Sequence, residues 1–199
     1  MRMTKYTHAC VRFEGDGGVL VVDPGGWSEP QALAGADAVL ITHEHADHFD
    51  ELRLLGAGLP VFAPNGANLG RVEATRLEPD QELEIAGFRV RTVGGRHAET
   101  YGGKPDVPNL GYLIDDAVYV PGDALARPGR PVETLFVPAA APWLKTAEAI
   151  EFVAAIRPHR AFAIHDGMLS DRGLPSLAII GRETGIDYRR LTPPETVEA

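Results

Sequence analysis

The sequence predicts an α/β protein in which two β-sheets pack face to face and helices cover their outer faces. Short apolar runs alternate with Gly- and Pro-rich turns, and the order of strands followed by helices occurs twice along the chain. The length of 199 residues and the apolar content of 44% allow a sizeable core. We therefore expect residues 1–199 to form a single domain with an (α+β) arrangement of two similar halves.

The first half of the chain predicts a hairpin followed by alternating helices and strands. A strand over 4–14 is followed by a turn over 14–18 and a second strand over 19–22. A short helix is expected over 28–37, with Ser28 as its N-cap. The remaining elements of this half are a strand over 39–41, a helix over 48–56 and a strand over 61–63, with a further helix over 66–72.

The second half of the chain starts again with strands. Its expected elements are strands over 82–86, 87–93, 110–114, 117–120 and 135–137, a helix over 146–156 and a last central strand over 161–164. The segment 99–109 lacks periodicity and is rich in Gly and Pro, so we expect a surface loop beside a site. The tail after Leu191 contains Pro193-Pro194 and is expected to be loose.

A dense cluster of metal-binding residue types directly follows the apolar strand 39–41. The cluster consists of His43, His45, Asp47 and His48. Imidazole and carboxylate are the ligands that zinc and related metals prefer. A polar surface loop is the alternative explanation, but three of the seven histidines of the chain lie in this one loop. Glu44 is not expected to be a ligand, because its neighbours on both sides must turn inward.

Three more predicted strands end at a residue of the same kind. His97 follows the strand over 87–93, Asp123 follows the strand over 117–120, and His165 follows the strand over 161–164. Side chains presented from several strand ends can converge on one sheet edge and be held rigidly. One histidine at a strand end is usually structural, but four independent strand ends carrying His or Asp favour a metal site.

The segment His43-Glu44-His45-Ala46-Asp47-His48 resembles the HxHxDH signature of the metallo-β-lactamase superfamily. The N-terminal segment His8-Ala9-Cys10 is similar to short sequences in the small L-ascorbate-6-phosphate lactonase-like branch of metal-dependent hydrolases. The resemblance to the superfamily is the wider one. It implies a four-layer αββα sandwich with two divalent metal ions at one edge, zinc being the first choice and manganese or iron also fitting. It also implies the ligands: His43, His45 and His97 for the first metal, Asp47, His48 and His165 for the second, and Asp123 as a bridge.

The resemblance implies a metal-dependent hydrolase that acts on a small-molecule substrate. A bridged metal pair lowers the pKa of a shared water and stabilises negative charge on a reacting oxygen. We therefore expect a metal-bridging hydroxide, oriented by Asp47, to attack a carbonyl or phosphoryl centre in a lactone or phosphodiester. Two alternatives remain open: an iron-binding, oxygen-activating or redox metalloprotein on the same fold, and a binding protein that has lost turnover.

Four residues near the expected site have two interpretations each. His8 lies either on the substrate side of the metal edge or inside the fold as a structural histidine. Arg96 either steers an anionic leaving group or is a solvated cation, and Trp143 either walls the pocket or belongs to the core. Asp23 either supports the metal loop by hydrogen bonding or forms an ordinary Asx-turn.

The composition narrows the classes of partner. The net charge of −9 argues against nonspecific binding of nucleic acid and suits the capture of cations, so an anionic substrate would need the metals or a nearby Arg. The single cysteine, Cys10, excludes an internal disulfide and is expected to be a small core residue. The N-terminus lacks an apolar leader segment, so we expect a cytoplasmic protein without a membrane span; a homo-oligomer is left open.

Overall fold

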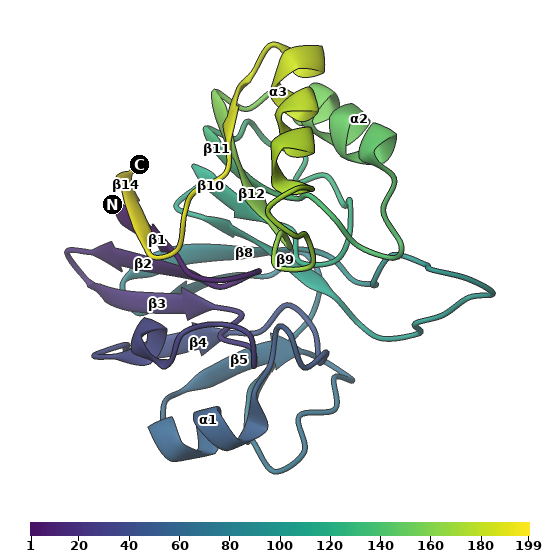
Figure 1. Cartoon of the computed structure of the whole chain (residues 1–199). Helices are drawn as coiled ribbons and strands as arrows, with labels where there is room; N and C mark the ends of the chain where they lie inside the picture. The colour runs from purple at the N-terminus through teal and green to yellow at the C-terminus, as the bar shows by residue number, and fades with distance from the viewer.

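A computed structural model describes residues 1–199 and contains two seven-stranded sheets packed face to face (Figure 1). The strands of the first sheet are β1 (Arg2–Lys5), β2 (Val11–Gly15), β3 (Gly18–Val22), β4 (Ala38–Leu40), β5 (Val61–Pro64), β6 (Thr75–Leu77) and β14 (Glu195–Glu198). They lie in the order β14-β1-β2-β3-β4-β5-β6. Pairing is antiparallel from β14 to β3 and parallel from β3 to β6.

The second sheet repeats this plan. Its strands are β7 (Glu82–Ile85), β8 (Phe88–Gly94), β9 (Leu110–Ile114), β10 (Val118–Val120), β11 (Thr134–Pro138), β12 (Arg160–Ile164) and β13 (Asp187–Arg189). They lie in the order β13-β12-β11-β10-β9-β8-β7. Pairing is antiparallel from β7 to β10 and parallel from β10 to β13, so each sheet has one hairpin side and one side of parallel strands.

Helices cover the outer face of each sheet, which completes the predicted four-layer sandwich (Figure 1). The helices are α1 (Glu51–Ala57) on the first sheet and α2 (Thr146–Ile156) and α3 (Ala178–Thr184) on the second. Leu54 of α1 is buried in one outer cluster, and Phe152 of α2 and Ile180 of α3 are buried in the other. The largest cluster lies between the sheets, where the rings of Phe13 and Phe136 pack edge to face at 6.3 Å.

Several predicted elements agree with the structure, among them β5, the strands from β7 to β12 and the helix α2 over 146–156. The helix predicted over 48–56 begins three residues later, at Glu51, and ends one residue later, at Ala57, where Gly58 in the left-handed conformation is its C-cap. Short elements without a sequence signal of their own, such as β6, α3 and β13, were not predicted. No helix of the structure is both long and apolar enough to cross a membrane.

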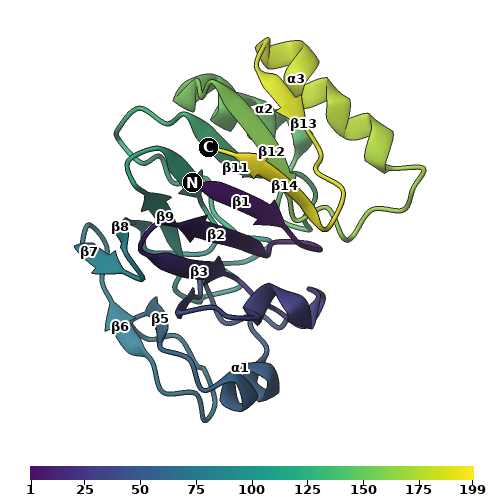
Figure 2. The ribbon, with the colours of Figure 1, turned by 90° about the vertical axis from the view of Figure 1, so that its left-hand side faces the viewer.

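Two predictions about the ends of the chain are wrong. The single strand over 4–14 is divided into β1 and β2, because His8 has a φ of +67° that an extended strand cannot contain, and Tyr6 N donates to Cys10 O across the break. The tail after Leu191 is not loose: β14 pairs antiparallel with β1, so the two termini lie side by side (Figure 2). β14 forms because β1, at the opposite end of the chain, pairs with it. The sequence pattern of the tail alone does not show this.

Two helix predictions are also wrong. The helix over 28–37 is only a 3₁₀ turn at Pro30–Leu33, and Ser28 is not its N-cap, because the Ser28 hydroxyl donates to Gly25 O. The segment 66–72 forms no helix. Its backbone groups bond to distant side chains instead: Asn68 N donates to the Glu44 carboxylate, and Ala67 O accepts from Arg76.

Candidate metal centre

Six of the seven histidines and two aspartates converge at one edge of the sandwich. They come from both sheets, and most of them follow the carboxyl end of a strand, as the sequence predicts. They form two groups in which the potential ligand atoms lie within 4.8 Å of one another: His8, Asp47, His48 and His165 in one group, and His43, His45, His97 and Asp123 in the other. The seventh histidine, His159, is exposed and lies outside both groups.

Hydrogen bonds fix which ring nitrogen of the buried histidines faces the centre. Nδ1 of His97 lies 2.6 Å from Ala98 O, and Nδ1 of His165 lies 2.6 Å from Ala140 O. A carbonyl oxygen can only accept, so both Nδ1 atoms carry a proton, and in the neutral rings both Nε2 atoms present a lone pair. His48 has the same arrangement, because its Nδ1 lies 2.7 Å from the Asp23 carboxylate. Metal-binding histidines are typically oriented by such bonds.

The inward-facing atoms have no satisfactory partner in the protein. Nε2 of His48, His97 and His165 and Oδ1 of Asp123 are buried without a hydrogen bond. Asp123 Oδ2 lies 3.1 Å from His165 Nε2 and 3.4 Å from His97 Nε2, so it stands between the two groups. Buried polar atoms without partners are rare, and several directed into one volume fit a bound cation. The donor set of these residues therefore fits bound metal.

The electrostatics of the centre also call for positive charge. Burial by itself lowers the pKa of His165, but the carboxylates of Asp123 and Asp47 outweigh burial and raise the pKa to about 9. Burial lowers the pKa of His48 as well, and Asp123 and Asp23 raise it well above its usual value. Burial keeps the pKa of His43 well below its usual value, so its ring is neutral. Divalent cations would balance the same carboxylates and use the same lone pairs.

Asp23 supports the ligand loop, which decides between its two interpretations. It follows β3 and is almost fully buried. Its carboxylate accepts hydrogen bonds from the backbone N–H and the hydroxyl of Thr42, both at 2.7 Å, as well as from His48. The Thr42 hydroxyl in turn lies 3.0 Å from Nδ1 of His43. Asp23 thus orients two of the histidines from a neighbouring strand.

Asp123 is positioned by a residue that the sequence analysis did not single out. The side chain of Asn109 accepts from Asp123 N at 3.0 Å and donates to Pro121 O at 2.9 Å. The intervening Gly122 has a φ of +65°, and a Cβ there would lie 2.4 Å from the Asn109 side chain. Nothing in the spacing of the sequence marks Asn109, because it acts across two strands rather than within the motif.

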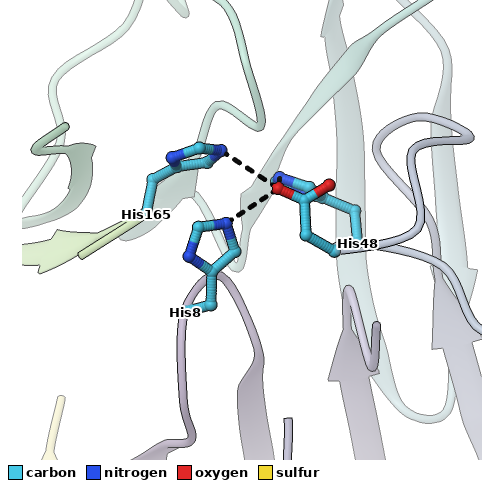
Figure 3. A group of neighbouring side chains, drawn as sticks. His8, His48 and His165 are labelled. Carbon is cyan, nitrogen blue, oxygen red and sulfur yellow. Dashed lines mark hydrogen bonds and ion pairs between the residues drawn. The ribbon is translucent and has the colours of Figure 1, made fainter. Parts of the chain in front are cut away.

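His8 is fully buried and contacts the centre. Its Nε2 lies 2.9 Å from Asp47 Oδ2, and Nε2 of His165 lies 3.4 Å from the same oxygen (Figure 3). Burial raises the pKa of the Asp47 carboxyl, but the neighbouring His165 ring and the hydrogen bond from His8 outweigh burial and lower that pKa far below its usual range. The ring of His8 also packs against that of Trp27 at 4.5 Å. His8 therefore positions the Asp47 carboxylate.

The other residues singled out in the sequence occupy distinct places. Trp143 lies at the cavity wall, and its indole N–H donates to Asp123 Oδ2 at 3.0 Å. Arg96 does not line the cavity; it is exposed and pairs with Asp106. Cys10 is buried, and burial raises the pKa of its thiol to about 12, as expected of a core residue.

A cavity of about 390 Å³ opens beside the centre. Its lining residues are Trp27, His45, Ala46, Asp47, His97, Thr100, Pro105, Asp123, Pro142, Trp143, His165 and Met168. Thr100 and Pro105 come from the segment 99–109, which was expected beside the site. Trp27 and Met168 were not predicted; the only sequence signal for Trp27 is an aromatic residue within a Gly- and Pro-rich loop after a strand.

Comparison with known proteins places this arrangement in a family. Residues 2–165 match the model of the β-lactamase superfamily domain. The chain belongs to the β-lactamase superfamily. This membership agrees with the predicted fold. The matched residues include all eight residues of the centre.

Two relatives resemble this chain over most of its length. Protein Rv0786c of Mycobacterium tuberculosis is 35% identical over 100% of this chain and 94% of its own length. A UPF0173 metal-dependent hydrolase of Chelativorans sp. is 30% identical over 62% of this chain and 63% of that protein. The predicted reaction class, a metal-dependent hydrolase of this superfamily, is confirmed at this level.

Solved structures share the fold at lower identity. A protein from Parabacteroides distasonis has a TM-score of 0.78 at 21% identity, covering 94% of this chain and 91% of that one. The metallo hydrolase Igni18 from Ignicoccus hospitalis has a TM-score of 0.72 at 17% identity, covering 98% and 97%. CmlA, a diiron β-hydroxylase from Streptomyces venezuelae, has a TM-score of 0.76 at 18% identity, covering 100% of this chain and 54% of CmlA. At these identities, the similarities show only that the chain shares its fold with these proteins.

Proposed function

We propose that this superfamily member is a dinuclear metal-dependent hydrolase acting on a carbonyl or phosphoryl centre. The observation that carries the proposal is the convergence of lone pairs: three Nε2 atoms and one carboxylate oxygen, all buried and unpaired, face a volume between two carboxylates. Packing alone does not account for such a set, since each unpaired buried polar atom costs about 1–3 kcal/mol.

The ligands divide between two metal positions. We assign His43, His45 and His97 to the first position and Asp47, His48 and His165 to the second. Asp123 is assigned as the bridge, because its Oδ2 stands between His97 and His165. Divalent cations bound there, with zinc as the first choice, supply Lewis acidity and a water of lowered pKa.

The residues of the chain would organise the reaction around that centre. The Asp47 side chain is 21% exposed and lines the cavity, so its carboxylate can accept a hydrogen bond from an attacking water. His8 holds that carboxylate from the buried side. The indole of Trp143 holds Asp123 through Oδ2. Both carboxylates are thus fixed before substrate arrives, which electrostatic catalysis requires.

The ligand assignment is tested by counting bound metal in single variants. We expect the wild type to bind two divalent ions per chain, as measured by elemental analysis after chelation and reloading. His97→Ala and His165→Ala should each weaken one of the two sites, and Asp123→Ala should weaken both. His159→Ala is the matched control, since His159 is exposed and remote from the centre. Stoichiometric metal binding that survives His97→Ala and His165→Ala would contradict the assignment.

The activity is tested on the same reloaded protein with lactones, phosphodiesters and thioesters. We expect hydrolysis that disappears on chelation and returns with zinc or manganese. Recovery with iron alone, together with oxygen consumption and no hydrolysis, would replace the hydrolase by the oxygen-activating alternative. Absence of any metal-dependent turnover in the protein with both sites filled would refute a hydrolase of these substrate classes.

A further inference from the structure

The walls of the cavity differ sharply from its metal-facing floor. Apart from the assigned ligands, the lining side chains are apolar with one exception, the hydroxyl of Thr100. The apolar members are Trp27, Ala46, Pro105, Pro142, Trp143 and Met168. The polar group of Trp143, its indole N–H, is already bonded to Asp123. The walls therefore offer contact area rather than polar recognition.

The cavity has no cationic side chain with which to bind an anionic substituent. None of its lining residues is Lys or Arg. The nearest arginine in sequence to the ligand His97 is Arg96, and its guanidinium is exposed and paired with Asp106. The chain as a whole carries a net charge of −9. A carboxylate or phosphate on the part of a substrate away from the reacting group would be desolvated without compensation.

Two large apolar side chains stand exposed at this cavity. Trp27 is 48% exposed and Met168 is 47% exposed, although side chains of this kind are normally buried. Trp27 packs against His8, beside the group that contains Asp47, and Trp143 packs against His97, beside the other group. An apolar surface therefore flanks both proposed metal positions. Such exposed apolar surface at a concave site is typical of ligand contact.

From these observations we infer that the substrate is an uncharged ester or lactone whose non-reacting part is an apolar chain or ring packed against Trp27 and Met168. The inference rests on the proposed hydrolase function and narrows it from carbonyl or phosphoryl centres to carbonyl centres. Hydrolysis breaks the acyl C–O bond, water adds its oxygen to the acyl carbon, and the alcohol leaves with a proton. The reacting carbonyl faces the ligands while the apolar part occupies the walls.

The experiment compares p-nitrophenyl esters on metal-loaded protein. We expect kcat/KM to rise from acetate through butyrate to hexanoate by about twofold to fourfold per methylene, the range set by partial to full burial of each group. The half ester of adipate has the same acyl length as hexanoate but ends in a carboxylate, and it should be a poorer substrate than hexanoate. The anion bis(p-nitrophenyl) phosphate should also be poorer.

Charge placed on the wall should invert this preference. Met168→Lys is expected to lower kcat/KM for the hexanoate ester and to raise it for the adipate half ester. The exposure of Met168 makes the substitution compatible with folding. Leu52→Lys is the matched control: Leu52 is 72% exposed on α1, does not line the cavity, and its replacement should change neither value.

Binding can be followed without turnover, because both tryptophans of the chain line this cavity. Their fluorescence should respond to 2-octanone at lower concentrations than to acetone, and Met168→Lys should weaken the response to 2-octanone. If the ketone binds in this way but the metal-loaded protein hydrolyses none of the esters, lactones, thioesters and phosphodiesters, the hydrolase proposal fails and the apolar site stands. If esters or phosphodiesters are hydrolysed with metal but chain length has no effect, or the charged substrates are preferred, this inference is overturned and the hydrolase stands.

Discussion

Replacement of Asp23 by asparagine tests whether the ligand loop is held in place from a neighbouring strand. The Asp23 carboxylate accepts three hydrogen bonds of 2.7 Å, two from Thr42 and one from His48. The amide of asparagine has one acceptor oxygen, so its NH₂ group must face either Thr42 N–H or His48 Nδ1–H. At least one buried donor then loses its partner, which should lower the free energy of unfolding by about 1–3 kcal/mol.

The same change should weaken metal binding. His48 can restore its bond to the amide NH₂ only by moving its proton to Nε2, and this removes the lone pair that faces the centre. Loss of such an orienting partner typically lowers metal affinity about 10- to 100-fold. Chelator competition measures the affinity, and urea unfolding of the metal-free protein measures the stability.

Asp37→Asn is the matched control for this substitution. The Asp37 carboxylate accepts a backbone N–H from Val19 at 2.8 Å, but it is exposed and lies away from the ligands. An amide oxygen can accept the same bond, so stability should change by less than about 0.5 kcal/mol and metal affinity should not change. A metal affinity of Asp23→Asn equal to that of Asp37→Asn would refute the orienting role.

Four further predictions concern two glycines and the single cysteine. Gly25→Ala should destabilise the fold and weaken metal binding, as measured by thermal unfolding and chelator competition, because its Cβ would lie 2.1 Å from Asp47 O. Gly56→Ala, in an open position within α1, should instead stabilise the protein by about 0.5–1 kcal/mol in urea unfolding. Cys10 should react with a thiol reagent at pH 8 only when the protein unfolds, because burial raises its pKa to about 12. Since the folded pKa is raised, this thiol should reduce stability as the pH rises from about 9 towards 12, and Cys10→Ala should remove that part of the pH dependence.

The sequence predicted that the candidate ligands lie close together, because their signal is local. The strands β4, β10 and β12 are mainly apolar, and residue types that bind metal, His43, Asp123 and His165, follow shortly after them. The cluster over 43–48 and His165 can therefore be recognised in the sequence from their places just after predicted strands. Strand ends on one edge of a sheet converge in space, so the position of each polar residue in the chain already implied its position in the site.

The residues that the sequence did not reveal act across the fold. β14 is a strand because β1, at the other end of the chain, offers it an edge. Asn109 matters because it bonds to Pro121 and Asp123 on another strand connection. Met168 lines the cavity only because the loop after β12 folds over the centre. Each of these depends on long-range pairing, which periodicity within a short window does not report.

The proposed metal pair would also connect the two sheets. The first sheet and its loops supply His8, the 43–48 cluster and Asp23, while the second supplies His97, Asp123 and His165. Each proposed metal position therefore takes ligands from both sheets. Direct bonds already join the sheets at this edge, from Tyr112 to Ile41 O and from His165 N to His8 O.

A ligand that binds only the folded protein stabilises it in proportion to the logarithm of its concentration over its dissociation constant. Metal bound between the sheets would therefore stabilise their packing as well as supply chemistry. The placement of the ligands at the strand ends also leaves them open to the cavity, whereas residues in the core between the sheets are buried. Buried histidine nitrogens without a partner destabilise the metal-free protein. Metal bound to them would offset this cost, because folding and metal binding are then one equilibrium.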